Sequence, residues 1–283
     1  MIDKEIYLQN AKPLIEIERS LQKTYRKDTF TLFLRALDNY DLIQDGDKVA
    51  VGMSGGKDSL ILAKMFQALK RFSKVDFDLD FVAMDPGYSK ENRAKLEAIC
   101  EYMGIPVRIY ESNIFEVTHE MAKDNPCYLC ARMRRGFLYD KVKELGFNKL
   151  ALGHHFNDVI ETTMLNLLWN GSFKTMMPKL KSENFEGLEL IRPLYLVEEK
   201  DIIRWMDFTA ITPMDEACPI VELKDDSKRA SVKTMIAAMK EDNPNVDKHI
   251  FKSAENVAMG MILGWEKDGK KHSFLDEYDE VKE

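Results

Sequence analysis

Two groups of residues in this chain have the types and spacing needed for chemistry. The first is Ser54-Gly55-Gly56-Lys57-Asp58-Ser59, which follows an apolar run and opens a helical pattern. Backbone N–H groups at a helix start, together with the positive end of the helix dipole, attract anions. The glycines let a phosphate approach the backbone closely, Lys57 adds a positive charge, and the two serines can donate hydrogen bonds. The stretch matches neither the Walker A loop nor G-x-G-x-x-G, so it predicts a phosphate site of another kind.

The second group is a set of cysteines. Cys127 and Cys130 form a C-x-x-C pair, a spacing typical of metal or redox chemistry in a cytoplasmic protein, and Cys218 follows later. Three cysteines are one short of a closed Cys₄ zinc site, but they could hold an iron–sulfur cluster with one iron left open. A redox pair with Cys218 unrelated, zinc with a fourth ligand other than cysteine, and a chance grouping remain alternatives. Cys100 lies in a helical pattern and is expected to be buried.

Strands and helices are expected to alternate along the chain around these residues. Apolar runs at 49–53, 79–84, 107–110 and 149–152 predict strands, and helices are expected over about 28–43, from about 57 to 69, before Met103, over about 130–145 and over about 157–169. This order indicates an α/β fold with a doubly wound, mostly parallel sheet. Ligands bind such sheets at the carboxyl ends of the strands. Both Ser54–Ser59 and Gly153–Asp158 lie just after a predicted strand.

The rest of the chain suggests three parts. Residues 1–45 are expected to form a helical lead-in, 46–212 the central domain with the C-x-x-C pair, and 213–283 a helical region with the third cysteine and an acidic tail. Residues 170–188, rich in Gly, Lys, Ser and Pro, predict a long connection.

Composition limits the class of protein. The chain has 283 residues, of which 45% are hydrophobic and 31% charged, as in soluble globular proteins. It has neither an apolar run long enough to cross a bilayer nor a secretory start, so a cytoplasmic protein without a membrane partner is expected. The net charge of −7 argues against a surface that binds nucleic acid throughout. Cations nevertheless gather in 19–35 and 132–149, as local phosphate-binding faces or as ordinary solvated helix surfaces.

Ser54–Ser59 resembles the PP-loop of the ATP-pyrophosphatase superfamily, whose members cleave ATP between its α- and β-phosphates. With this loop the chain combines Pro126-Cys127-x-x-Cys130, Arg132-x-Arg134-Arg135-Gly136, Gly153-His154-His155-x-x-Asp158 and Cys218-Pro219. Over roughly residues 20–240 it therefore resembles the iron–sulfur tRNA thiolases, in particular the tRNA 2-thiocytidine synthetase family. It departs from that family at Val221, where a second C-x-x-C usually ends, and at Asn157-Asp158, where two aspartates are typical.

This resemblance implies a [4Fe–4S] cluster on Cys127, Cys130 and Cys218, beside ATP and Mg²⁺. Asp58, Asp158 and the three cysteines are then the implied catalytic residues. Residues implied in ATP binding are Met53, Ser54, Gly55, Gly56, Lys57, Asp58, Ser59, Asp85, Gly153, His154 and Asp158.

Other side chains are candidates for the RNA substrate. Arg134, Arg135, Lys174 and Lys179 are the first choices, with Lys23, Arg26, Lys27, Arg132 and Lys181 as further phosphate contacts. Trp169 and Phe173 could stack on an everted base, although aromatic residues are more often part of the core. His154 and His155 could act as acid and base, contact phosphate, or form a satisfied pair at a strand end.

The implied function is an ATP-dependent tRNA thiolase. It would adenylate the 2-oxo group of a tRNA pyrimidine, cytidine being favoured, and replace the oxygen with sulfur delivered through the cluster. An unidentified sulfur donor and a homodimer are expected. One alternative is a PP-loop sulfurtransferase or desulfurase that acts on a small molecule, and another is a nucleotide or redox sensor without catalysis.

Overall fold

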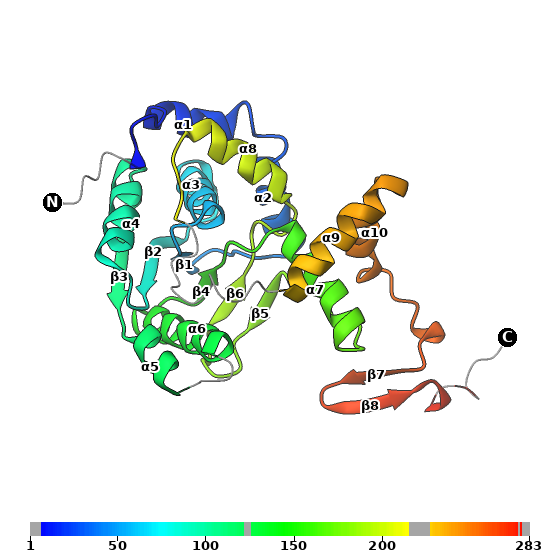
Figure 1. Ribbon diagram of the computed structural model, residues 1–283. Helices are drawn as coiled ribbons and strands as arrows, with labels where there is room; N and C mark the ends of the chain where they lie inside the picture. The colour runs from blue at the N-terminus through cyan, green and yellow to red at the C-terminus, as the bar shows by residue number, and fades with distance from the viewer. Residues whose placement is uncertain (1–6, 122–125, 215–226, 277, 279–283) are drawn as a thin grey trace.

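The computed structural model describes residues 7–121, 126–214, 227–276 and 278 (Figure 1). Its centre is a six-stranded sheet in the order β3-β2-β1-β4-β6-β5. All neighbouring strands pair in parallel except β5, which is antiparallel to β6. The strands are β1 (Lys48–Met53), β2 (Asp78–Asp85), β3 (Val107–Glu111), β4 (Lys149–Ala151), β5 (Lys179–Lys181) and β6 (Glu189–Ile191). The predicted mostly parallel sheet is confirmed.

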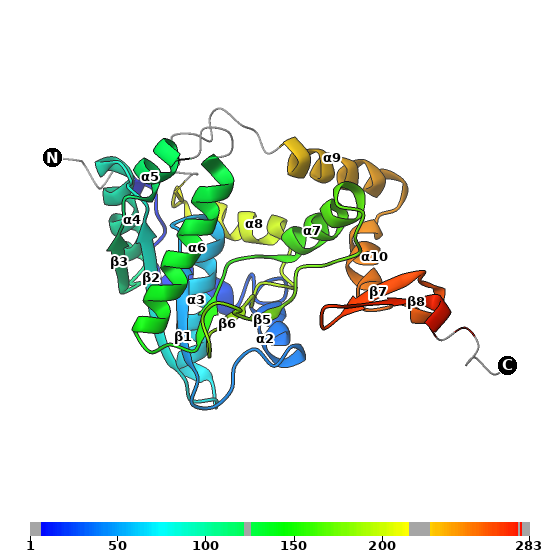
Figure 2. The ribbon, with the colours of Figure 1, turned by 90° about the horizontal axis from the view of Figure 1, so that it is seen from below.

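Helices cover both faces of this sheet (Figures 1 and 2). One face carries α1 (Leu14–Gln22), α2 (Phe30–Asn39), α3 (Lys57–Phe72), α4 (Lys90–Tyr102) and α8 (Glu199–Thr209), and the other carries α5 (Ile114–Met121) and α6 (Pro126–Glu144). Beside the sheet, α7 (Phe156–Trp169), α9 (Ser227–Asp242) and α10 (Val246–Ser253) pack on one another. No helix of the described residues combines the length and the apolar character needed to cross a membrane.

The main hydrophobic core lies between the sheet and the first group of helices. The early helix α1 is part of it, because Ile17 and Leu21 are buried and the buried Trp205 of α8 donates a hydrogen bond to Ser20 (3.0 Å). Cys100 is buried as predicted, and burial raises the pKa of its thiol to about 12. It is therefore a packing residue.

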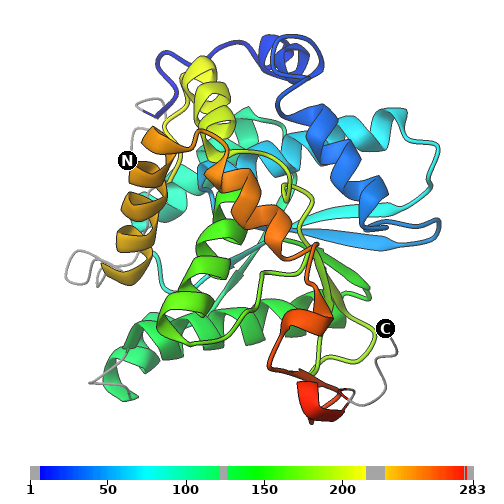
Figure 3. The same cartoon turned by 90° about the vertical axis from the view of Figure 1, so that its right-hand side faces the viewer.

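Several elements differ from the prediction. The connection expected over 170–188 contains β5, and α5 was not predicted. The C-terminal region is helical in α9 and α10, but it then forms a hairpin of β7 (Gly264–Lys267) and β8 (Lys270–Ser273), which lies beyond α10 and apart from the central sheet (Figures 1 and 3). Helix α6 begins at Pro126, so the C-x-x-C pair lies in its first turns rather than before it.

The order of the strands also determines where a ligand fits. From β1 the chain moves to β2 and β3 on one side, and later to β4 and β6 on the other. The direction therefore reverses between β1 and β4. In open α/β sheets such a reversal leaves a crevice at the carboxyl ends of the two strands, and ligands bind there.

Candidate active site at the carboxyl ends of β1 and β4

A cleft of about 650 Å³ opens at this reversal point. It is bordered by the loop after β1, the loop after β4, the start of α7 and one side of α6. The residues that line it are Gly52, Met53, Ser54, Asp58, Ser59, Met84, Tyr88, Ala131, Arg134, Arg135, Leu138, Leu152, Gly153, His154 and Asp158. The two predicted sequence stretches therefore meet in one cleft, together with two arginines of α6.

The loop after β1 is fixed from within by two serines. Ser59 is buried, and its hydroxyl donates to the carbonyl of Gly56 (2.9 Å) while it accepts from the backbone N–H of Ser54 (3.3 Å). The Ser54 hydroxyl accepts from the N–H of Gly56 (3.3 Å). Helix α3 begins directly afterwards at Lys57, so its first N–H groups are at the cleft. This is the arrangement that favours a bound phosphate.

Two glycines permit the close packing around this loop. Gly55 has φ +81°, a left-handed conformation, and a Cβ there would lie 2.5 Å from the sulfur of Met214. Gly153, after β4, allows that loop to touch the start of α3, since a Cβ would lie 3.2 Å from the backbone carbon of Asp58. The backbone N–H of Met214 also donates to the carbonyl of Gly55 (2.9 Å).

Lys57 lies between two carboxylates. Its ammonium is 3.2 Å from Asp58 and 3.2 Å from Glu199, the first residue of α8. Burial lowers the pKa of Lys57, but the two carboxylates outweigh this effect and raise the pKa above its ordinary value. Lys57 is thus held as a cation beside the phosphate-binding loop.

Asp58 and Asp158 line the cleft, and the buried His155 lies between them behind its wall. His155 Nε2 is 3.8 Å from Asp58 Oδ1, and Asp158 Oδ2 accepts a hydrogen bond from the backbone N–H of His155 (2.9 Å). This contact caps the start of α7. Burial raises the pKa of Asp58, although His155 and Lys57 oppose the shift. Asp58 Oδ1 is buried and has no hydrogen-bond partner among the described residues.

His154 is a neutral imidazole at ordinary pH. Burial and, after it, the positive charge of Arg192 lower its pKa to about 4. Its Nδ1 has no hydrogen-bond partner among the described residues. The satisfied-pair interpretation of the two histidines therefore does not hold for His154.

Four charged residues in ion pairs beside the cleft were missed by the sequence analysis. Arg229 of α9 contacts Asp158 (3.1 Å) and Glu161 (3.4 Å), and Lys233 of α9 pairs with Glu199 (2.7 Å). Burial raises the pKa of Glu161 even though Arg229 opposes it. Helix α9 is thus attached by two cations to the acidic residues around the cleft. No motif in the sequence marks these pairs, because their partners come from different helices.

The start of α6 carries the candidate cluster ligands. Cys127 and Cys130 are three residues apart in the first turns of this helix. Cys130 is half-buried, and the next residue, Ala131, lines the cleft. Thiolates are favoured at a helix N-terminus, so the position of Cys130 suits a ligand of an iron–sulfur cluster next to the cleft. The side chain of Cys127, and Cys218 and Val221 altogether, lie outside the described residues.

Asp85 stabilises the turn at the end of β2. Its carboxylate accepts from the backbone N–H groups of Gly87 (2.9 Å) and Tyr88 (2.6 Å) and pairs with Arg93 (2.9 Å). Burial raises the pKa of Asp85, but these donors outweigh it and the pKa is lowered. Its predicted contact with ATP stays a prediction.

The residues nominated for RNA contact lie in several places. Arg134 and Arg135 line the cleft, whereas Lys174 and Lys181 are exposed on the segment between α7 and β6. Lys179 donates to the backbone carbonyl of Asp41 (2.8 Å). Trp169 (39% exposed) and Phe173 (46% exposed) are outside the core. Both rings are therefore accessible to a ligand.

Comparison with known proteins identifies the family of this chain. The PP-loop domain model matches residues 15–217, and such a domain implies ATP binding. The chain is 36% identical over 249 residues to a tRNA-cytidine(32) 2-sulfurtransferase of Psychrobacter sp. strain PRwf-1, covering 86% of this chain and 65% of that protein. It is 34% identical to the protein of that name from Pseudomonas putida strain F1, covering 87% and 88%.

A solved structure supports the fold. The U34-tRNA thiolase NcsA from Methanococcus maripaludis with its [4Fe-4S] cluster superposes with a TM-score of 0.67 at 23% identity, covering 86% of this chain and 81% of that chain. The fold, the loop after β1 and the sequence relatives all indicate the same family. The chain belongs to the PP-loop family, and within that family it is similar to the tRNA thiolases.

Proposed function

We propose that this protein is an ATP-dependent tRNA thiolase that converts a tRNA cytidine to 2-thiocytidine. The observation that carries the proposal is the cleft in which the PP-loop, Asp58 and Asp158 meet the side of α6 that follows the C-x-x-C pair. This arrangement supports a nucleotide site next to a sulfur site. The named activity of the sequence relatives supports the choice of base.

The first step is the activation of the base by ATP. The 2-oxo group attacks the α-phosphate, the bond between the α- and β-phosphates breaks, and pyrophosphate leaves. Lys57 and the N–H groups at the start of α3 lie where they can stabilise the negative charge of pyrophosphate. Mg²⁺ commonly binds through phosphates and one or two carboxylates, a role that Asp58 and Asp158 suit. Among the described side chains, no cluster of three or more metal-binding residues is present.

The second step replaces AMP with sulfur. A [4Fe–4S] cluster held by Cys127, Cys130 and Cys218, with one iron lacking a protein ligand, would supply the sulfide. Arg134 and Arg135 line the cleft and can neutralise phosphate groups of AMP and of the RNA backbone. We further propose a separate sulfur donor and a homodimer as parts of the working enzyme.

The test is an anaerobic assay with unmodified tRNA, ATP, Mg²⁺ and sulfide, in which nucleosides are analysed by mass spectrometry and pyrophosphate is measured. We expect 2-thiocytidine with the intact protein and none with Cys130→Ser. Cys100→Ser is the matched control, because Cys100 is buried in the main core and does not line the cleft. Release of pyrophosphate on addition of a small sulfur acceptor, with no thiolation of any tRNA, would contradict the proposal.

A further inference from the structure

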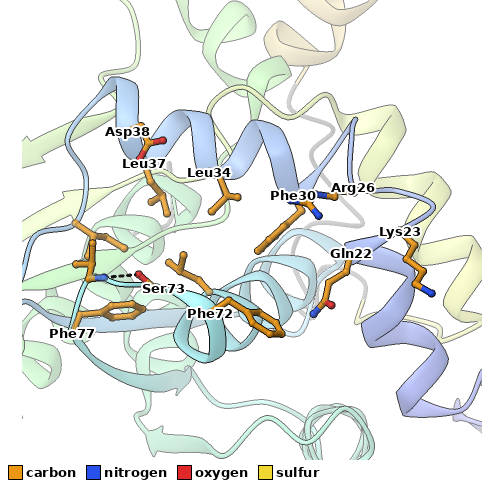
Figure 4. A pocket seen from close by; sticks show the side chains of 13 residues that line it. Gln22, Lys23, Arg26, Phe30, Leu34, Leu37, Asp38, Phe72, Ser73 and Phe77 are labelled. Atoms are coloured by element: carbon orange, nitrogen blue, oxygen red, sulfur yellow. Dashed lines mark hydrogen bonds between the residues drawn. The ribbon is translucent and has the colours of Figure 1, made fainter.

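A second cavity, of about 520 Å³, lies away from the active site (Figure 4). It is a groove between α1, α2, the end of α3 and the segment that leads into β2. Its lining residues are Gln22, Lys23, Arg26, Phe30, Leu34, Leu37, Asp38, Ile43, Leu69, Phe72, Ser73, Val75 and Phe77. Nothing in the proposed reaction uses this groove.

The floor of the groove is apolar and aromatic. Phe30 and Phe77 are buried, whereas Phe72 at the edge is 68% exposed. Figure 4 shows the rings of Phe30 and Phe72 near one end of the groove and that of Phe77 near the other. An aromatic side chain this exposed beside a preformed cavity is a suitable surface on which a planar ring can stack.

One end of the groove is cationic. Lys23 and Arg26 are exposed, and neither has an ion pair with any described residue. Asp28, the only acidic residue between positions 19 and 35, is itself 3.8 Å from Arg204 of α8. The positive charge of Lys23 and Arg26 is therefore left for an external anion. Asp38, at the opposite end, offers a hydrogen-bond acceptor (Figure 4).

We propose that this groove is a second docking point for the tRNA, which takes up an unstacked nucleobase while Lys23 and Arg26 hold the neighbouring phosphates. Stacking on aromatic rings between phosphate contacts is how proteins commonly bind unpaired nucleotides. The inference rests on the proposed function for the class of ligand. An acidic, partly apolar protein segment is the competing occupant.

The docking point is remote from the chemistry. Helix α3 begins at the PP-loop with Lys57 and ends at the groove with Phe72, so the two sites are about 22 Å apart along this helix. A tRNA is longer than this distance. The groove would therefore help to bind and orient the tRNA. It would not contact the base that reacts.

The test measures binding of a full-length tRNA transcript by fluorescence anisotropy at several salt concentrations. Arg26→Glu should weaken binding about tenfold and reduce the slope of log affinity against log salt by about one. Phe72→Ala should weaken binding at least about fivefold and leave that slope unchanged, because stacking is not ionic. Lys248→Glu, an equal change of charge at an exposed site on α10, is the control and should bind as the intact protein does.

The outcomes separate the two proposals. If the intact protein binds no tRNA, the proposed function fails. If it binds tRNA and the Arg26 and Phe72 variants bind equally well with the same salt slope, the docking point is wrong and the protein segment becomes the occupant. Thermal unfolding of each variant verifies that it is folded.

Discussion

At the scale of single residues, Gly153 determines how closely the loop after β4 approaches the PP-loop. A Cβ at this position would lie 3.2 Å from both the backbone carbon and the Cβ of Asp58, closer than most real contacts. We therefore expect Gly153→Ala to displace the start of α3 and to weaken binding of α,β-methylene-ATP at least about tenfold, at a cost in stability of about 1–3 kcal/mol. Calorimetric titration and urea unfolding measure the two effects.

Gly136→Ala is the matched control for that experiment. Gly136 lies within α6, and a Cβ there would meet nothing within 4 Å. Alanine favours the helix over glycine, so this variant should be more stable by about 0.5–1 kcal/mol and should bind the nucleotide analogue normally. Equal nucleotide affinities for the Gly153 and Gly136 variants would show that the close approach of the two loops does not matter.

His154 provides a prediction on pH. Its pKa falls from 6.5 to about 4 on folding, so the unfolded chain binds a proton that the folded chain does not bind between these values. Stability should therefore rise with pH across this window and be lost as pH falls through it. When the pH falls from about 7 to about 5, the free energy of unfolding of His154→Gln should decrease by roughly 2 kcal/mol less than that of the intact protein. Urea unfolding at both pH values measures these losses, and equal losses for the two proteins would mean that folding does not lower the pKa of His154.

Residue types alone predicted much of the site, but not its ion pairs. Ser54–Ser59 and Gly153–Asp158 could be found because a phosphate loop and a strand end have local signatures. Glu199 and Arg229 could not, since an acidic residue at a helix start or a lone arginine has many ordinary uses. Which carboxylate each cation contacts is decided by how α7, α8 and α9 pack.

At the scale of elements, the attachment of α9 to the site depends on Arg229. Its guanidinium contacts Asp158 and Glu161, and the Glu161 side chain is only 8% exposed. Arg229→Ala would leave the buried Glu161 carboxyl without its partner. We therefore expect faster amide hydrogen exchange in peptides from 228–241 and a loss of thiolation rate of at least about tenfold.

Lys228→Ala controls for the loss of a charge from the same helix, because Lys228 is exposed. Its exchange and activity should match those of the intact protein. If Arg229→Ala exchanges no faster than Lys228→Ala, the ion pairs of Arg229 do not hold α9, and its apolar contacts through Val232 and Ile236 and the Lys233–Glu199 pair remain to do so.

The elements that sequence reasoning missed are mostly short. Strands β5 and β6 have three residues each, too few to display alternation, and β5 pairs antiparallel at the edge of the sheet. The β7–β8 hairpin did have a signal, because Asp268 and Gly269 both adopt positive φ and D-G is a preferred sequence for such tight turns. The long strands β1 and β2 and the helices α3 and α7 were predicted because their apolar patterns extend over enough residues.

At the scale of the whole molecule, the hairpin is the least integrated part of the described chain. Met261 (88% exposed) and Leu263 (82% exposed) lead into it, and the strands pair with each other. A chain ending at Ile262 should therefore unfold within about 2 °C of the intact protein. A fall in the thermal midpoint beyond about 5 °C would mean that the hairpin supports the rest of the fold.

The contact between Met214 and Gly55 has a consequence for how the protein is made. The PP-loop is complete in sequence after about 60 residues, yet Glu199 and Met214, which touch Lys57 and Gly55, follow some 140–160 residues later. At ribosomal rates of about 5–20 residues per second, these partners are synthesised roughly 7 to 30 seconds after the loop. During translation the phosphate site is thus assembled late, after β1 to β4 and β6 can already have formed the sheet beneath it.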